Sequence, residues 1–192
     1  MSSHYFIGIP IENSVKEKCA NWQQELRHSM SYKVWTNPHD LHITLKFLGD
    51  CTERQIDEWA AHLTKVKALP SFSLKAGPAG TFGDKKHPRV FYVNVERNNL
   101  LLEIKELIEE VGELLGFPKE KRDYLPHITL AKKWQGGESP IYKGGNYFNE
   151  QLELLIDRLH IYKIHPKSKA KYEIVATYNL KEDQRGATYK DL

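Results

Sequence analysis

Three stretches of the chain place apolar residues three and four positions apart, which is the pattern of an amphipathic helix. The first covers residues 14–30, the second begins at Thr52 and ends before Pro70, and the third spans about 99–115. Gly116 follows the third stretch, and glycine is common directly after a helix. We therefore expect three helices that each bury one face.

Shorter runs between these stretches alternate apolar with polar positions or are rich in β-branched and aromatic residues, which predicts strands. They lie near the N-terminus (YFIGI) and at residues 41–48, 72–76, 89–95, 126–134, 159–164 and 172–180. The glycine-containing stretch 135–147 predicts a mobile loop, and the residues from about Glu182 predict a polar tail.

The first part of the chain resembles the second when the sequence is shifted by 85 residues without a gap. The sequence His-Ile-Thr-Leu at 42–45 then falls on the same sequence at 127–130, and Phe6 falls on Phe91. A four-residue match alone could arise by chance. The apolar face of the first helix also falls on that of the third, and this agreement predicts two similar halves.

The order of elements lacks the regular alternation of strands and helices that a parallel doubly wound sheet requires, so we expect an α+β fold. It would be bilobal, with two mostly antiparallel sheets backed by helices, pseudo-twofold internal duplication and a central cleft. The expected lobes are approximately 1–84 and 89–181 of a single domain over 1–192, with a polar tail at 182–192 and strands that can be exchanged between the lobes.

The composition is that of a globular protein, because 40% of the 192 residues are hydrophobic and 28% are charged. The net charge of +3 is too small for a protein that coats nucleic acid by bulk charge. The stretch 158–172 contains basic but no acidic residues, and could attract an anionic substrate locally or form a solvated surface.

Neither an export signal nor a membrane-spanning run of ~20 apolar residues is evident in the sequence. The two cysteines, Cys19 and Cys51, predict neither a disulfide framework nor a thiolate zinc site. We expect a soluble protein of the reducing cytoplasm with no membrane partner.

The repeated His-x-Thr sequence carries the candidate chemistry. Side chains alternate along a strand, so His42 and Thr44 share one face, as do His127 and Thr129. Two imidazoles can remove one proton and deliver another near neutral pH, while hydroxyl groups hold an anion between them. Hydrolysis of a phosphodiester has this requirement, and we expect these four residues to carry it out.

A single His-x-Thr on a strand is weak evidence, since many such histidines are ordinary surface or packing residues. Two at equivalent places of a repeat are stronger evidence. A metal site is less favoured, because a catalytic zinc requires three protein ligands. His39 and Asp40, directly before His42, leave metal binding as a minor alternative.

LHITLKFLGD at 41–50 and RDYLPHITLAK at 122–132 resemble the two motifs of the two-histidine (2H) phosphoesterases. Within that superfamily they are most similar to the bacterial and archaeal RNA 2',3'-cyclic phosphodiesterases, formerly called 2'-5' RNA ligases. The resemblance covers most of the chain. It implies a bilobal fold, catalysis without metal or cofactor, and opening of a terminal 2',3'-cyclic phosphate to a 2'-phosphate.

The resemblance also implies that His42 donates a proton to the leaving 3' oxygen, that His127 is the base, and that Thr44 and Thr129 hold the phosphate. From the residues alone, the acid and the base cannot be told apart. The group usually has arginine after the second motif, where this chain has Lys132, which keeps the charge but loses bidentate geometry.

Other substrate-binding candidates lie around these motifs. Strict alternation places Lys132 on the face opposite His127 and places Lys46 on the face of Thr44, so Lys46 is an alternative cation. Phe6 and Tyr172 could line the cleft and stack a terminal base, although Phe6 could equally be a core residue. Arg122 lies just upstream of the second motif.

The leading hypothesis is therefore hydrolysis of 2',3'-cyclic phosphate ends of RNA, or of cyclic nucleotides, by a monomeric enzyme. The alternatives are the reverse reaction, a 2'-5' ligation, and a module that binds RNA or nucleotides without turnover. The intact pair of His-x-Thr sequences favours catalysis, because binding alone has little need for two titrating imidazoles.

Overall fold

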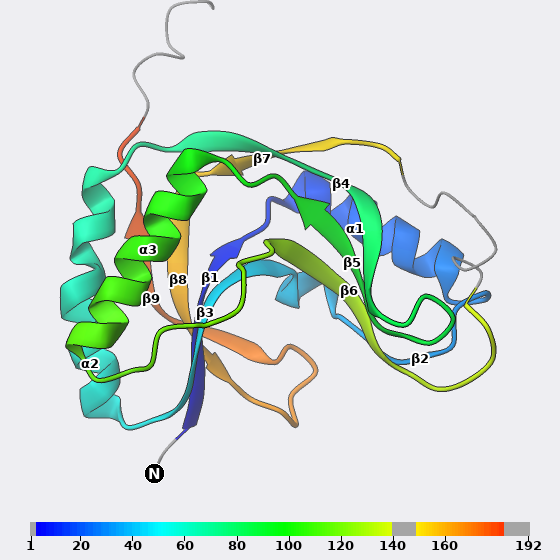
Figure 1. Ribbon diagram of the computed structural model, residues 1–192, viewed down its shortest axis with the longest axis horizontal. Helices are drawn as coiled ribbons and strands as arrows, with labels where there is room; N and C mark the ends of the chain where they lie inside the picture. The colour runs from blue at the N-terminus through cyan, green and yellow to red at the C-terminus, as the bar shows by residue number, and fades with distance from the viewer. Residues whose placement is uncertain (1–2, 140–148, 183–192) are drawn as a thin grey trace, which may run out of the picture.

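The computed structural model describes residues 3–139 and 149–182, and these residues form one mixed α/β unit. The elements follow in the order β1 (Ser3–Pro10), α1 (Asn13–Leu26), β2 (Tyr32–Trp35), η1 (Pro38–Asp40), β3 (His42–Cys51), α2 (Glu53–His62), η2 (Leu63–Ala68), β4 (Phe72–Gly83), β5 (Pro88–Val95), α3 (Asn99–Leu114), β6 (His127–Trp134), β7 (Leu152–Ile156), β8 (Arg158–Ile164) and β9 (Tyr172–Asn179) (Figure 1). Within the described ranges, no helix is long and apolar enough to cross a membrane.

The strands form one hydrogen-bonded sheet in the order β7-β4-β5-β6-β3-β1-β8-β9, and β2 pairs with β6 beside this path. The pairings between these strands are antiparallel. β3 and β6 meet where Ile43 lies opposite Ile128. The sheet therefore consists of two halves that join at the two strands carrying His42 and His127.

The expected α+β class with mostly antiparallel strands is confirmed, and the two expected sheets are the two halves of a single sheet. Strands from both parts of the chain occur in each half, because β8 pairs with β1 and β4 pairs with β5. The turn at 84–87, near the expected lobe boundary, connects two paired strands. The division into lobes 1–84 and 89–181 stays a prediction.

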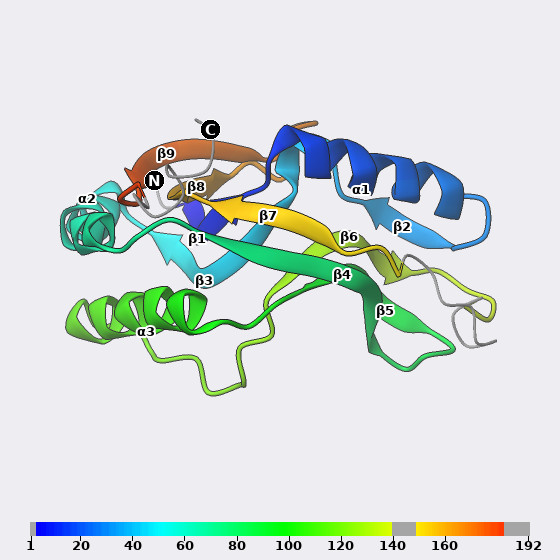
Figure 2. The ribbon, with the colours of Figure 1, turned by 90° about the horizontal axis from the view of Figure 1, so that it is seen from above.

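The first and third helices pack against strands that are not their neighbours in the sequence. α1 follows β1 but contacts β6 and β7, whereas α3 follows β5 but contacts β3 and α2. α2 and α3 therefore lie side by side at one end of the molecule, and α1 lies at the other (Figure 2). Each helix buries its apolar stripe against the sheet, as the sequence pattern predicts.

Capping residues set where the second and third helices begin. Thr52 caps α2 in a reciprocal capping box with Gln55, and the Asn98 side chain accepts a hydrogen bond from the backbone of Leu101 at the start of α3. α1 begins at Asn13 and ends at Leu26, four residues before the expected end. The second helix is also shorter than expected, since residues 63–68 continue as a 3₁₀ helix.

A β-bulge interrupts β3 two positions after Ile43. Gly8 lies opposite Thr44 and Ile7 lies opposite Lys46, so Leu45 is the extra residue. After this extra residue, the next side chains lie on the face opposite to the one that strict alternation would give them. Lys46 consequently shares the buried face of Ile7 instead of the face of Thr44.

β6 contains the equivalent bulge. Tyr92 lies opposite Thr129 and Phe91 lies opposite Ala131, so Leu130 is the extra residue. Leu45 and Leu130 are separated by the 85 residues of the sequence repeat. The two central strands therefore share an irregularity as well as a sequence.

The repeat is not free of gaps. Phe6 lies opposite Phe47, and Val90 lies opposite Lys132, which is 85 residues after Phe47. The counterpart of Phe6 is therefore Val90, and the expected match of Phe6 with Phe91 is wrong by one residue. The first strands thus match at one residue less than the 85-residue repeat. The helices match at one residue more, since a shift of 86 residues places every buried residue of α1 on a buried residue of α3.

Two short strands, β2 and β7, were not predicted from the sequence. β2 is only four residues long, and β7 alternates three buried residues, Leu152, Leu154 and Ile156, with exposed ones. The period-two signal of β7 was present but lies beside the glycine-containing stretch 135–147. Residues 140–147 of that expected loop and 183–192 of the expected tail lie outside the described residues.

We predict that Ile43→Ala destabilises the protein strongly, because Ile43 is fully buried where the two halves of the sheet join. The expected loss in free energy of unfolding is about 2–5 kcal/mol, measured by denaturant titration. The matched control is Ile174→Ala, since Ile174 lies in a strand but is 53% exposed, and should change stability by about 0.5 kcal/mol or less. Equal effects of the two substitutions would contradict a critical junction at Ile43.

Candidate active site

His42 begins β3 and has hydrogen-bond partners at both ring nitrogens. Nδ1 lies 2.7 Å from the carbonyl oxygen of Asp40, and Nε2 lies 3.0 Å from Oγ1 of Thr44. A backbone carbonyl can only accept, so Nδ1 carries the proton of the neutral ring and Nε2 accepts from the Thr44 hydroxyl. Phe6 and Tyr172 lie against the ring, with centroid distances of 4.6 and 5.1 Å. The imidazole is therefore held with Nε2 toward Thr44.

His127 begins β6 and is held in the corresponding way. Its Nδ1 lies 2.7 Å from the carbonyl oxygen of Leu125, which fixes the proton of the neutral ring on Nδ1 and leaves Nε2 for a substrate. Phe82 and Tyr92 surround the ring at centroid distances of 4.9 and 5.2 Å. Each histidine thus donates to the carbonyl two residues before it.

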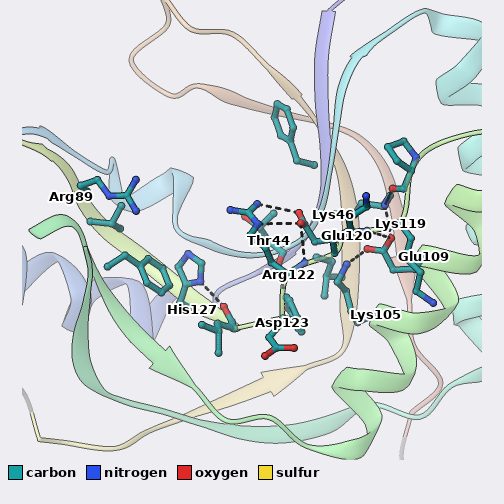
Figure 3. A pocket seen from close by; sticks show the side chains of 18 of the residues that line it. Thr44, Lys46, Arg89, Lys105, Glu109, Lys119, Glu120, Arg122, Asp123 and His127 are labelled. Atoms are coloured by element: carbon teal, nitrogen blue, oxygen red, sulfur yellow. Dashed lines mark hydrogen bonds and ion pairs between the residues drawn. The ribbon is translucent and has the colours of Figure 1, made fainter. Parts of the chain in front are cut away.

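A cleft of about 960 Å³ runs beside the central strands and is lined by one residue of each His-x-Thr sequence. Thr44 and His127 both line it, and residues 118–125 form much of its wall (Figure 3). His42 reaches this lining through its hydrogen bond to Thr44. One histidine therefore lines the groove, and the other is hydrogen-bonded to a residue that lines it.

Positive side chains outnumber negative ones around this cleft. Its acids are Glu109, Glu120 and Asp123, and its cations are Lys46, Arg89, Lys105, Lys119, Lys121 and Arg122. Phe47 also lines the cleft and is 60% exposed, which is unusual for a large apolar side chain in a strand. The cleft combines a positive potential with an apolar surface, and this combination suits an anion that carries an aromatic group.

The bulge in β6 places Lys132 on the face of His127. Lys132 lies opposite Val90, which alternates with Tyr92 and Asn94, the partners of Thr129 and His127. Lys132 therefore lies on the face of His127, and the expectation from strict alternation is wrong. The charge of Lys132 also contributes a small part of the lowering of the His42 pKa.

The bulge at Leu45 in β3 likewise places Lys46 on the face opposite Thr44. Lys46 is 6% exposed, and its ammonium lies 2.6 Å from Oε2 of Glu109 and 2.9 Å from the carbonyl oxygen of Pro118. Its charge is thus neutralised by a buried carboxylate. The expectation that Lys46 shares the face of Thr44 is wrong, although part of the residue borders the cleft.

The remaining candidates have different surroundings. Phe6 is 3% exposed and stacks on Tyr162 at 4.7 Å, so it supports the His42 ring from within the core. Tyr172 is partly buried and meets the same ring edge-on. Arg122 lines the cleft, but its guanidinium makes hydrogen bonds of 3.1 and 3.2 Å to the carboxylate of Glu120. Thr129 lies beyond the cleft lining on the face of His127.

Burial determines the protonation of both histidines. It lowers the pKa of His42 to about 4, and Asp40 opposes this shift through its carbonyl and its carboxylate. Burial also lowers the pKa of His127, which the Leu125 carbonyl opposes. Both imidazoles are therefore neutral in the free protein at neutral pH.

Asp40 is a site residue that the sequence analysis weighed only as a metal ligand. Both oxygens of its buried carboxylate accept from the backbone N–H of Lys171 at 3.0 Å, which fastens the β8–β9 connection beside His42. The common spacing of Asp40 and Leu125, two residues before each histidine, was a visible signal. Among the described residues, no group of three or more His, Cys, Asp or Glu side chains could hold a metal.

Comparison with known proteins agrees with this geometry. Residues 9–92 match the family of LigT-like phosphoesterases. The chain is 32% identical over 178 residues to the RNA 2',3'-cyclic phosphodiesterase of Bacillus subtilis, covering 92% of this chain and 96% of that protein. It is also 32% identical over 137 residues to the RNA 2',3'-cyclic phosphodiesterase of Thermotoga maritima, covering 68% of this chain and 73% of that protein.

Solved structures share the fold. The TT0787 protein of Thermus thermophilus superposes with a TM-score of 0.77 at 22% identity, covering 94% of this chain and 99% of that one. Escherichia coli LigT complexed with 3'-AMP superposes with a TM-score of 0.74 at 17% identity over the same shares.

We predict that NMR of the free protein finds His42 and His127 neutral at pH 7, because burial disfavours their charged forms. The Hε1 signal of His42 should titrate with a midpoint near 4, and that of His127 with a midpoint below its ordinary value of about 6.5. His42→Ala and His127→Ala assign the two signals. A His42 midpoint at or above 6.5 would show that the ring is solvated.

Proposed function

This chain belongs to the LigT-like phosphoesterases, a family of two-histidine phosphoesterases, and we propose that it hydrolyses terminal 2',3'-cyclic phosphates of RNA to 2'-phosphates. One observation carries the proposal most directly. Two histidines are held alike by the carbonyl two residues before them; His127 lines a positively lined groove, and His42 is hydrogen-bonded to Thr44 of the same lining. The RNA 2',3'-cyclic phosphodiesterase relatives, at 32% identity, support the choice of substrate.

The proposed reaction needs one neutral and one protonated imidazole. Nε2 of His127 takes a proton from a water molecule as the water oxygen bonds to phosphorus. Nε2 of the protonated His42 gives its proton to the 3' oxygen as the bond between that oxygen and phosphorus breaks. The products are a 3' hydroxyl and a 2'-phosphate, and the two histidines have exchanged protonation states. The resemblance to the family supports this assignment of acid and base.

The hydroxyl groups and one lysine are proposed to hold the phosphate. Thr44 already donates its hydroxyl hydrogen to Nε2 of His42, so a phosphoryl oxygen can replace this nitrogen as the acceptor once His42 is protonated. Thr129 occupies the corresponding position on β6. Lys132, placed on the same face by the bulge, supplies a positive charge to the phosphoryl oxygens.

The cleft beside Thr44 and His127 is proposed to hold the terminal nucleoside. Phe47 offers an exposed ring on which a base can stack, and this role replaces the one expected for the buried Phe6. Arg122 and Tyr172 stay candidates for contacts with the substrate. RNA ends or cyclic nucleotides are therefore the proposed partners.

We also propose that the protein acts in the reducing cytoplasm as a monomer. Cys19 and Cys51 are both buried and unpaired. The two histidines and two threonines proposed for catalysis all come from one chain, so the proposed reaction does not require a second copy.

We predict that the purified protein, in the presence of EDTA, converts a short RNA ending in a 2',3'-cyclic phosphate to one ending in a 2'-phosphate. His42→Ala and His127→Ala should each reduce kcat/KM at least ~10²-fold, because each removes one proton transfer. Phosphorus NMR or chromatography of the products measures the conversion.

His87→Ala is the control, since His87 is an exposed histidine outside the site, and it should leave turnover unchanged. Binding without turnover would favour the binding-module alternative. Loss of activity with EDTA would favour a metal mechanism. Joining of two RNA ends in excess over hydrolysis would favour 2'-5' ligation.

We predict a bell-shaped dependence of kcat/KM on pH, with its maximum between about 4 and 6.5. Burial lowers the pKa of both histidines, so the form with one proton on the pair exists mainly below the ordinary pKa of histidine. Activity should fall at higher pH as the acid loses its proton, and at lower pH as the base gains one. An optimum of kcat/KM above pH about 7.5 would contradict this reasoning.

A further inference from the structure

A buried cluster of charges lies where α3 meets β3, at the end of the cleft away from His127 (Figure 3). Glu109 of α3 forms ion pairs with Lys46 of β3 and with Lys105 one helical turn earlier. The side chains of Lys46, Lys105 and Glu109 are 6, 10 and 4% exposed. Gly112 leaves room for the cluster, because a Cβ there would lie 3.0 Å from Cε of Lys46.

This cluster holds the start of the loop at 118–125 that forms the cleft wall. Oε2 of Glu109 accepts a hydrogen bond of 3.2 Å from the backbone N–H of Glu120, and Lys46 donates one of 2.9 Å to the carbonyl of Pro118. Farther along the loop, the Tyr124 hydroxyl donates to the carbonyl of Thr44 at 3.2 Å. The loop is therefore fastened to α3 and at two points to β3.

The end of the same loop supplies the hydrogen bond that orients His127. Leu125, whose carbonyl accepts from Nδ1 of His127, follows Tyr124 directly. A shift of the loop would move this carbonyl and rotate the imidazole. The position of the buried carboxylate is thus linked to the direction of Nε2 of His127 through five residues of backbone.

Gln23 occupies the corresponding position on α1. It lies 86 residues before Glu109, is 2% exposed, and donates to the carbonyls of Thr36 and Leu130 at 2.8 Å each. Thr36 belongs to the segment that leads into His42, as Glu120 belongs to the segment that leads into His127. In both halves, a buried polar side chain of a helix holds the segment before a histidine.

We propose that Glu109 is a positioning residue for His127, acting through its hydrogen bond to the 118–125 loop. The inference rests on the role proposed for His127. Stability alone does not account for this cluster, because apolar side chains of similar volume often stabilise a protein as well as a buried ion pair or better. What apolar side chains cannot supply is an acceptor for the N–H of Glu120.

The test compares two triple variants that differ only in this acceptor. Lys46→Met and Lys105→Met remove both ammonium groups, and the third change is Glu109→Gln in one protein and Glu109→Leu in the other. The amide oxygen of glutamine can still accept from Glu120, whereas leucine cannot. We expect similar Tm values but kcat/KM on a cyclic-phosphate RNA about 10- to 100-fold lower in the leucine variant, because a small misplacement of a reacting group has an effect of this size.

NMR gives a second readout that does not depend on the proposed reaction. The Leu125 carbonyl stabilises the protonated form of His127, so the titration midpoint of His127 should be lower in the leucine variant, while that of His42 stays the same. Wild-type protein without activity would refute the proposed function, and the titration would still test the positioning role.

Equal kcat/KM and equal His127 midpoints in the two triple variants would overturn the proposal. If either variant fails to fold, Glu109→Asp tests the same contact, since it keeps the charge but withdraws the carboxylate from Glu120 by one methylene; an unchanged His127 midpoint would again refute it. Glu106→Gln is the control, because Glu106 pairs with Lys119 of the same loop at the surface and should leave both readouts unchanged.

Discussion

The site depends on the burial of two isoleucines where the halves of the sheet meet. Ile43 and Ile128 lie opposite each other and are fully buried, so the strands cannot rotate about their own axes. Because side chains alternate along a strand, fixing the isoleucines turns the histidine before each of them and the threonine after it to the other face. The core therefore determines both the distance between β3 and β6 and the direction of their polar side chains.

Much of this arrangement follows from the sequence, because it depends on local periodicity. The apolar stripes predicted the three helices, and alternation placed His42 with Thr44 correctly. The pairing of strands could not be predicted in the same way, because it joins residues far apart in the chain. The exchange of α1 and α3 between the two halves of the sheet likewise leaves no local signal.

The bulges explain why the two lysines were misplaced. A bulge adds one residue to a strand without a distinctive composition, and Leu45 and Leu130 are typical strand residues. The residues that directly follow each bulge then face the side opposite to that expected. Lys46 consequently became a core residue that requires Glu109, and Lys132 came to lie on the face of His127.

Burial of the histidines links protonation to the presence of a phosphate. A charged imidazole in the free protein would lie among Phe6, Tyr162 and Tyr172 without sufficient solvation, and the pKa of His42 is low for that reason. An anion beside Thr44 would compensate the charge and raise this pKa. His42, the proposed acid, would then become protonated chiefly when an anion lies beside Thr44, so binding of the proposed substrate would itself assemble the proposed pair of one protonated and one neutral histidine.

α1 and α3 each pack on the half of the sheet that does not precede them in the chain, and together they support both His42 and His127. Gln23 of α1 bonds to the segment before His42 and to β6 at Leu130, while Glu109 of α3 bonds to the segment before His127 and to Lys46 of β3. Each helix thus contacts one catalytic strand and the approach to the other. Neither histidine can move without disturbing a helix that also holds the strand of its partner. The separation of the two imidazoles is therefore a property of the whole fold.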